Sequence, residues 1–139
     1  MREILFRGKR NDNGEWFEGG LVHRTRYYGD PCDDYVIVEN AEFDYDYYEA
    51  HTVIAETVGQ FTGLTDKNGK KIFEGDIFKG KVIEGKLVNY VFWYDEEERG
   101  FVYGSSYKKG YRMSLASYAL SVKEFEVIGN IHDNPELLK

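Results

Sequence analysis

Short apolar runs alternate with polar turn residues along this chain, and the spacing predicts a protein built mostly from β-strands. Runs rich in Val, Ile and aromatic residues are separated by clusters of Gly, Asn and Asp every 8–12 residues or so. The clearest runs lie at residues 3–7, 15–18, 35–38, 87–94 and 125–131. Such short runs are typical of strands rather than of helices. The cluster Asn11-Asp12-Asn13-Gly14 between the first two runs predicts an opening hairpin.

The segment Gln60–Ile77 predicts two chain reversals in succession. Asn68-Gly69 lies between two strand-like runs, and Asn-Gly is the strongest short hairpin signal because both residues tolerate positive φ. Glu74-Gly75-Asp76 predicts the second reversal, since Asp offers a local side-chain acceptor and Gly a free φ. We therefore expect a tight hairpin followed by a new strand from Ile77.

Leu87–Tyr94 is the strongest strand signal, and we expect it to be central and buried on both faces, with Val91, Phe92 and Trp93 in the main core. Earlier in the chain, Gly19-Gly20 predicts a bend or bulge. Residues 28–34 are expected to form a loop, marked by Gly29-Asp30-Pro31.

Helix signals are few. Ser114 could cap a short helix over Leu115–Ser121, and Asn134-Pro135 predicts a final helical turn. Too few helices exist for parallel crossovers, so the fold class is mostly β with antiparallel strands. We expect an SH3-type barrel in the C-terminal half, N-terminal β-hairpins packed on it, and one or two short helices. Residues 1–139 fit a single domain, with 1–55 and 56–139 as the alternative subdivision.

Composition agrees with a β-rich globular chain expected in the cytoplasm. Aromatic residues make up 17% of the 139 residues, and aromatics fit a pleated, half-buried surface. The single cysteine, Cys32, excludes an intrachain disulfide. The N-terminus lacks the apolar run of a secretory signal, and no run approaches the roughly 20 apolar residues of a spanning helix.

The net charge of −7 is concentrated in one part of the chain. Residues 27–66 contain ten acidic residues and no Lys or Arg, whereas the remainder carries a net charge of +3. A block of this kind repels phosphate backbones at its own surface, although the remainder could still present a basic patch. We expect most of these carboxylates to be exposed.

One candidate partner-binding surface lies inside the acidic block. If residues 42–49 are extended, carboxylates and tyrosines face opposite sides. The candidate residues are Glu42, Asp44, Tyr45, Asp46, Tyr47 and Tyr48. The tyrosine face could dock on a host protein or form a homo-oligomer contact, because interfaces favour aromatic anchors. The favoured alternative for the acidic face is solvation, since the segment lacks the glycine and distal glutamate of a calcium loop.

A second candidate surface is the expected loop around Lys108. It combines three cations with two tyrosines: Tyr107, Lys108, Lys109, Tyr111 and Arg112. This composition is typical of elements that follow a phosphate backbone and stack on bases. An ordinary exposed hairpin tip has the same composition, and a pI near 5.0 argues against a dedicated nucleic-acid binder.

No motif predicts catalysis, a metal site or a cofactor. His23, His51 and His132 have no neighbours at ligand spacing, so surface histidines are the simpler interpretation. The acidic neighbours of Cys32 disfavour an activated thiolate. The chain also lacks the glycine patterns of nucleotide-binding loops and of the hydrolase nucleophile elbow. We therefore expect a protein that is not an enzyme and has no cofactor or metal.

Three segments resemble the YopX-like family of small phage and prophage proteins. They are Arg2–Arg10 with Asn13–Trp16, then Glu56–Leu64 continuing through Asp66–Gly69 to Glu74–Ile77, and finally Glu126–Ile131 with Asn134–Leu138. The resemblance implies a mostly β fold with SH3-type barrel character and work inside a bacterial host. The family has no established activity, so the resemblance transfers no site residue.

These observations lead to two functional hypotheses. The first is a phage or prophage accessory protein that acts as a non-enzymatic interaction module and binds a host or phage protein. The alternative is a nucleic-acid-associated SH3-type module that uses the Tyr107–Arg112 loop. Neither hypothesis involves a membrane, and an enzyme is the third and weakest class.

Overall fold

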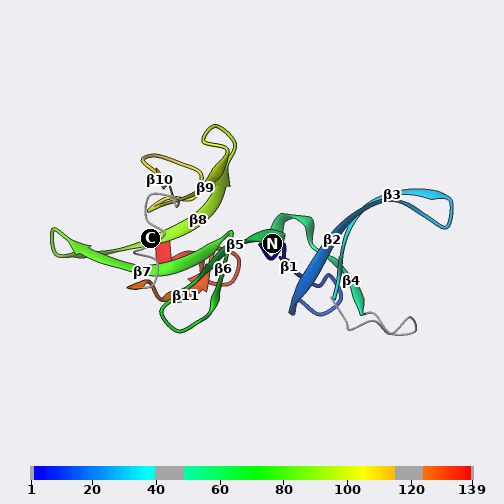
Figure 1. Ribbon diagram of the computed structural model, residues 1–139, viewed down its shortest axis with the longest axis horizontal. Helices are drawn as coiled ribbons and strands as arrows, with labels where there is room; N and C mark the ends of the chain where they lie inside the picture. The colour runs from blue at the N-terminus through cyan, green and yellow to red at the C-terminus, as the bar shows by residue number, and fades with distance from the viewer. Residues whose placement is uncertain (1, 40–48, 115–123, 139) are drawn as a thin grey trace. The chain divides into compact units, whose positions relative to one another are not determined.

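A computed structural model describes residues 2–39, 49–114 and 124–138, which form antiparallel sheets with short 3-10 turns (Figure 1). The chain divides into two compact units, Met1–Phe61 and Thr62–Lys139. The expectation of a mostly β, antiparallel fold is confirmed. No described sheet closes on itself, so the expected SH3-type barrel is not confirmed.

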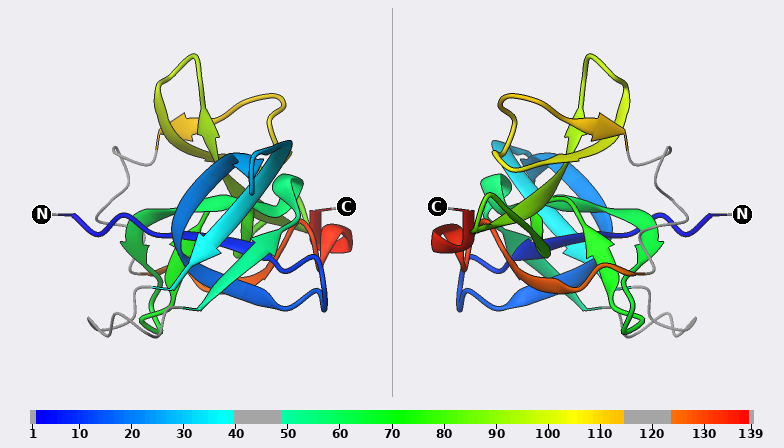
Figure 2. Two further views of the ribbon diagram at one scale, coloured as in Figure 1. Left: turned by 90° about the vertical axis from the view of Figure 1, so that its right-hand side faces the viewer. Right: turned by 90° about the vertical axis from the view of Figure 1, so that its left-hand side faces the viewer.

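Unit 1 is a sheet with the strand order β4-β3-β2-β1-β5. Its strands are β1 (Phe6–Lys9), β2 (Trp16–Tyr27), β3 (Asp30–Val38), β4 (Ala50–Val53) and the start of β5 (Gly59–Thr65), with the 3-10 turn η1 (Ala55–Thr57) before β5. Neighbouring strands run antiparallel, and β2, β3 and β4 lie side by side in Figure 2. The opening hairpin β1–β2 is as expected, with Lys9 opposite Trp16.

Of the bend or bulge expected at Gly19-Gly20, the bulge is wrong, because β2 continues through both glycines with no register irregularity there. A Cβ at Gly19 would overlap the carbonyl oxygen of Val38 on β3. Gly19 therefore permits the close approach of two backbones.

The loop expected over residues 28–34 is also wrong. Tyr28 and Gly29 are the only two residues between the paired residues Tyr27 and Asp30, and β3 starts at Asp30. Pro31 lies next to an irregularity in the β2–β3 register. A missing N–H is tolerated at such a position, so proline does not stop the strand.

Unit 2 has its own sheet, with the strand order β10-β9-β8-β7-β11. Its strands are β7 (Asp76–Ile83), β8 (Lys86–Asp95), β9 (Gly100–Gly104), β10 (Met113–Ser114) and β11 (Val127–Asn130). The end of β5 pairs with β6 (Lys71–Phe73) ahead of this sheet, and the 3-10 turn η4 (Pro135–Leu138) follows it.

The hairpin at Asn68-Gly69 is confirmed, but its turn differs from the type that two positive φ values would give. Of the pair only Gly69 has a positive φ, 79°. The amide of Gly69 donates to the carbonyl oxygen of Asp66, and the amide of Asp66 donates to that of Lys70. This is a three-residue loop that ends in a left-handed glycine. The reversal at Gly75 is also confirmed, with the Asp76 carboxylate accepting from the amide of Phe73.

The core of unit 2 lies on both sides of β8, as the sequence predicts. Phe92 packs with Phe78, Tyr103 and Ile72 on one side. Val91 and Trp93 pack on the other side with buried Ile77 and Val102, beneath the half-buried Leu137 and Leu138 of η4. Val91, Phe92 and Trp93 are essentially inaccessible to solvent. Burial on both faces is therefore confirmed for residues 91–93 and is wrong for residues 87–90 and for Tyr94, which are exposed or only partly buried. The first half of β8 extends beyond the strand that covers the second half, β9.

The C-terminal turn is confirmed, with a different role for Asn134 than a helix cap. The side-chain oxygen of Asn134 accepts from the amide of Asn130, and the Asn130 side chain accepts from the amides of His132 and Asp133. The interior helix expected over 115–121 lies outside the described residues. Ser114, its expected cap, belongs to β10.

Candidate functional site

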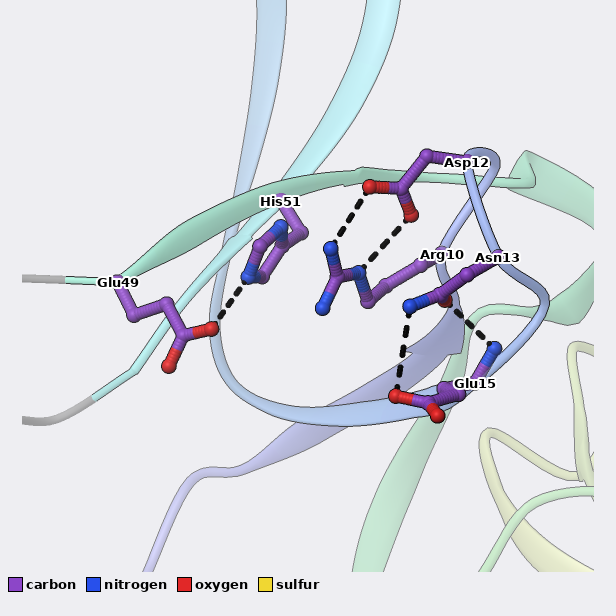
Figure 3. Close-up of polar contacts among 6 residues, drawn as sticks. All are labelled: Arg10, Asp12, Asn13, Glu15, Glu49 and His51. Carbon is purple, nitrogen blue, oxygen red and sulfur yellow. Dashed lines mark hydrogen bonds and ion pairs between the residues drawn. The ribbon is translucent and has the colours of Figure 1, made fainter.

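A polar cluster at the β1–β2 turn gathers charged residues of unit 1 (Figure 3). The Arg10 guanidinium donates two hydrogen bonds to Asp12, from Nε at 2.9 Å and from Nη2 at 2.7 Å. The Asp12 carboxylate raises the pKa of Arg10, and Arg10 lowers that of Asp12. The Asn13 side chain contacts Glu15 in the same turn. These bonds hold the turn in one conformation.

The pair His51 and Glu49 lies beside this cluster (Figure 3). His51 Nε2 lies 2.6 Å from the Glu49 carboxylate, and the ring packs edge-on against Phe17. Among the described residues, no group of three His, Cys, Asp or Glu side chains could hold a metal ion.

The Tyr107–Arg112 loop places its five predicted residues in different environments. Tyr107 packs edge-on against Trp93 with 6.1 Å between the ring centroids, and is therefore part of the fold. Lys108, Lys109 and Tyr111 are exposed, and Lys108 Nζ lies 5.3 Å from the Tyr107 ring centroid. Of the five, these three side chains extend into solvent.

Arg112 is engaged by the acidic turn between β8 and β9. Its guanidinium lies 2.9 Å from Asp95 and 2.8 Å from Glu97. The pKa of Asp95 is lowered by hydrogen bonds from the backbone amides of Glu98 and Glu97 and by the charge of Arg112. These effects outweigh the desolvation of the carboxylate. Neutralised in this way, Arg112 contributes little to attraction of a phosphate backbone.

The acidic partner-binding residues Glu42, Asp44, Tyr45, Asp46, Tyr47 and Tyr48 lie outside the described residues. Their role stays a prediction. Elsewhere in the acidic block, two side chains of β2 contact carboxylates of β3. Arg24 lies 2.7 Å from Asp34, and His23 Nε2 lies 2.6 Å from Asp33. Most of the described carboxylates of the block are exposed, as expected: Asp30, Asp33, Glu39, Glu49 and Glu56. Asp66 is the buried exception among the described residues.

The tip of the β2–β3 hairpin presents an aromatic pair that the sequence interpretation missed. Tyr28 is 91% exposed and Tyr27 52% exposed, and their rings meet edge-on at a centroid distance of 4.5 Å. The Arg24 guanidinium lies 4.4 Å from the centroid of the Tyr27 ring. Tyr27 is thus held in place by a cation–π contact while Tyr28 extends into solvent.

The backbone at this tip is unfavourable for a tyrosine. Tyr28 has φ = 49° and Gly29 has φ = 88°. Two-residue turns of this kind favour Asn-Gly, since a bulky side chain at positive φ crowds the backbone. The signal in the sequence was Tyr28-Gly29 between residues that can pair, but Gly29-Asp30-Pro31 favoured a longer loop.

Comparison with protein families shows to which family the chain belongs. The model of the YopX protein family matches residues 5–139. The chain belongs to the YopX family. This YopX protein also resembles the crystal structure of protein EF1440 from Enterococcus faecalis, with 23% identity, complete coverage of both chains and a TM-score of 0.55. That likeness concerns the fold alone.

Two further findings limit what is established about this YopX protein. Comparison with curated proteins found no match. In the described part of the chain, no helix has the length and apolar character needed to cross a membrane.

Proposed function

We propose that this YopX protein is a non-enzymatic interaction module of phage or prophage origin that binds a host or phage protein in the bacterial cytoplasm. The observation that carries the proposal is the aromatic pair at the β2–β3 tip, where Tyr28 is 91% exposed and its ring meets that of Tyr27 edge-on. A large aromatic side chain that is almost fully exposed contributes little packing to the fold, and aromatic side chains are the anchors that interfaces favour.

The chemistry of the tip fits a protein partner. Tyrosine offers a large contact area with few rotatable bonds, and Tyr and Arg are enriched among the residues that dominate binding energy. Tyr27 is ordered in advance by Arg24, which reduces the entropy lost on binding. The carboxylates of Asp30, Asp33 and Asp34 follow on the same hairpin and disfavour a nucleic-acid backbone.

The second candidate function is nucleic-acid association through the loop around Lys108, on an SH3-type module. The exposed Lys108, Lys109 and Tyr111 favour it, since cations beside an aromatic ring suit single-stranded nucleic acid. The pairing of Arg112 with Asp95 and Glu97 weakens it.

Capture from bacterial lysate with and without nuclease tests the two candidates. The tagged full chain should retain a specific host or phage protein after nuclease treatment. Loss of all partners on nuclease treatment, together with loss in the double variant Lys108→Glu/Lys109→Glu, would favour the second candidate. Absence of any retained partner in lysates of both infected and uninfected cells contradicts the proposed function.

A further inference from the structure

The β7–β8 hairpin of unit 2 extends beyond the end of β9, as Figure 1 shows. β9 pairs with only the second half of β8, from Val91 to Asp95. The first half of β8 pairs with β7 on its other side. Within the described ranges, residues 86–90 of β8 therefore have no strand on the side where β9 ends.

The backbone groups of Leu87 and Asn89 point toward this open side. The Phe92 carbonyl oxygen accepts from the amide of Gly75, which precedes β7, so residue 92 faces β7. Backbone groups alternate in direction along a strand, so odd-numbered residues of β8 face β9. The one extra residue of the β7–β8 irregularity lies on β7, between Phe78 and Lys81, and β8 keeps a regular alternation.

A groove of about 240 Å³ follows the same edge. Leu87 and Asn89 line it from β8, Ser105 and Ser106 from the turn after β9, and Leu137 and Leu138 from η4. The Asn89 side chain also donates to the Leu137 carbonyl oxygen at 2.9 Å, which fixes η4 beneath the strand. The volume is below the 300–1,000 Å³ typical of small-molecule sites, and suits side chains of an added strand.

The surroundings of the groove are basic in an acidic protein. Residues 79–89 and 105–110 contain five lysines and one acidic residue, whereas the whole chain has a net charge of −7. Lys86, Lys108 and Lys109 are exposed. Opposite charge on a partner would favour encounter and register at this edge.

We propose that the open edge of β8 binds an extended acidic segment of another protein by strand addition. The partner backbone pairs with the N–H and C=O groups of Leu87 and Asn89. Its alternate apolar side chains enter the groove beside Leu87, and its acidic side chains lie near the lysines. This interaction surface is additional to the Tyr28 tip and does not depend on the function proposed for it.

A peptide is a better occupant than nucleic acid, because the backbone N–H and C=O groups of Leu87 and Asn89 are arranged as at the edge of a β-sheet. Unpaired strand edges are templates for another strand, and proteins usually block them with charge or cover. Here the edge carries Leu87, which is 49% exposed, with Val82 opposite it at 68%. An apolar pair of this kind attracts a strand instead of repelling it.

Binding of a labelled peptide of alternating glutamate and valine tests this proposal. Fluorescence anisotropy should show saturable binding to the full chain, and the amides of Leu87 and Asn89 should exchange more slowly with the peptide bound. Leu87→Glu should weaken binding about tenfold or more. Ile83→Glu is the matched control, since Ile83 is 48% exposed on the same hairpin but does not line the groove.

Three results would overturn the proposal. They are absence of peptide binding at about 1 mM, equal losses for Leu87→Glu and Ile83→Glu, and binding without slower exchange at Leu87 and Asn89. Displacement of the peptide by oligothymidine would assign the lysines to nucleic acid instead. Both glutamate variants alter exposed side chains and add the same charge, so they separate contact in the groove from general electrostatics.

Discussion

Asp66 shows how one side chain joins a turn to a distant strand. Its carboxylate is buried and accepts hydrogen bonds from the amides of Asn68, Lys70 and Val127, at 2.9, 2.9 and 3.0 Å. Burial alone would raise its pKa. The three amide bonds, with some help from the Lys70 charge, outweigh the burial, and the pKa of Asp66 is lowered. The ionised form therefore stabilises the fold.

Replacing Asp66 by Asn tests this role. One oxygen becomes an amide N–H₂ group, which sets a donor against one of the three backbone donors. We expect a loss of about 1–3 kcal/mol in the free energy of unfolding at pH 7, measured by urea denaturation. Because the folded pKa lies below the unfolded value of about 3.9, this stabilisation is present above that value and is lost as pH falls through the folded pKa. A difference between wild type and variant that persisted at lower pH would contradict this assignment.

Gly69 allows a separate test of the same turn. It has φ = 79° and open space where a Cβ would lie, so Gly69→Ala adds backbone strain without a clash. We expect a loss of about 1 kcal/mol in unfolding free energy, measured by urea denaturation. Gly20→Ala in β2 is the control, since Gly20 lacks a positive φ and its Cβ would meet only the Val38 carbonyl oxygen, at 3.9 Å. Equal effects of the two changes would show that the turn does not require the left-handed glycine.

At the residue scale, the sequence was sufficient for local turn chemistry and insufficient for remote contacts. Asn68-Gly69 predicted the hairpin because its preference is local. The bond between Asp66 and Val127 joins positions 61 residues apart, and no local pattern encodes it. Tyr28 was missed for a local reason, since Gly29-Asp30-Pro31 indicated a longer loop than the two-residue turn between Tyr27 and Asp30.

At the scale of elements, β8 combines a buried half with an exposed half. Phe92 is fully buried among Phe78, Tyr103 and Ile72. Phe92→Ala should therefore lower the unfolding free energy by about 3–5 kcal/mol, measured by urea denaturation. Tyr94→Ala, two residues along the same strand at an exposed position, should cost much less. A small effect of Phe92→Ala would show that this strand is not central to the core.

Strand positions were predictable and strand lengths were not. Residues 87–94 matched β8 because β-branched and aromatic residues favour a strand, although only residues 91–93 of the run are buried. β2 and β3 are longer than expected because Gly19 and Pro31 act through neighbouring strands. In a sequence pattern, glycine and proline predict the end of a strand. In this sheet, Gly19 lies against a neighbouring backbone and Pro31 lies next to a register irregularity.

At the scale of the whole molecule, the two units offer two different surfaces. Unit 1 carries the tyrosine tip, with carboxylates of β3 following it, and unit 2 carries a basic groove beside an open strand edge. The net charge of −7 alone would suggest one acidic surface. The expected subdivision at 55 and 56 stays a prediction, and the boundary between the compact units lies within β5.

The Tyr28→Asn variant tests the role of the β2–β3 tip most directly. The measurement is how much partner it captures from nuclease-treated bacterial lysate. Asparagine suits the left-handed backbone at residue 28, so the variant should be at least as stable as wild type and yet retain much less partner. Glu84→Asn is the matched control, because Glu84 has φ = 50° before Gly85 in the β7–β8 turn. It should gain stability and retain the partner. Undiminished capture by Tyr28→Asn would contradict a binding role for the tyrosine tip.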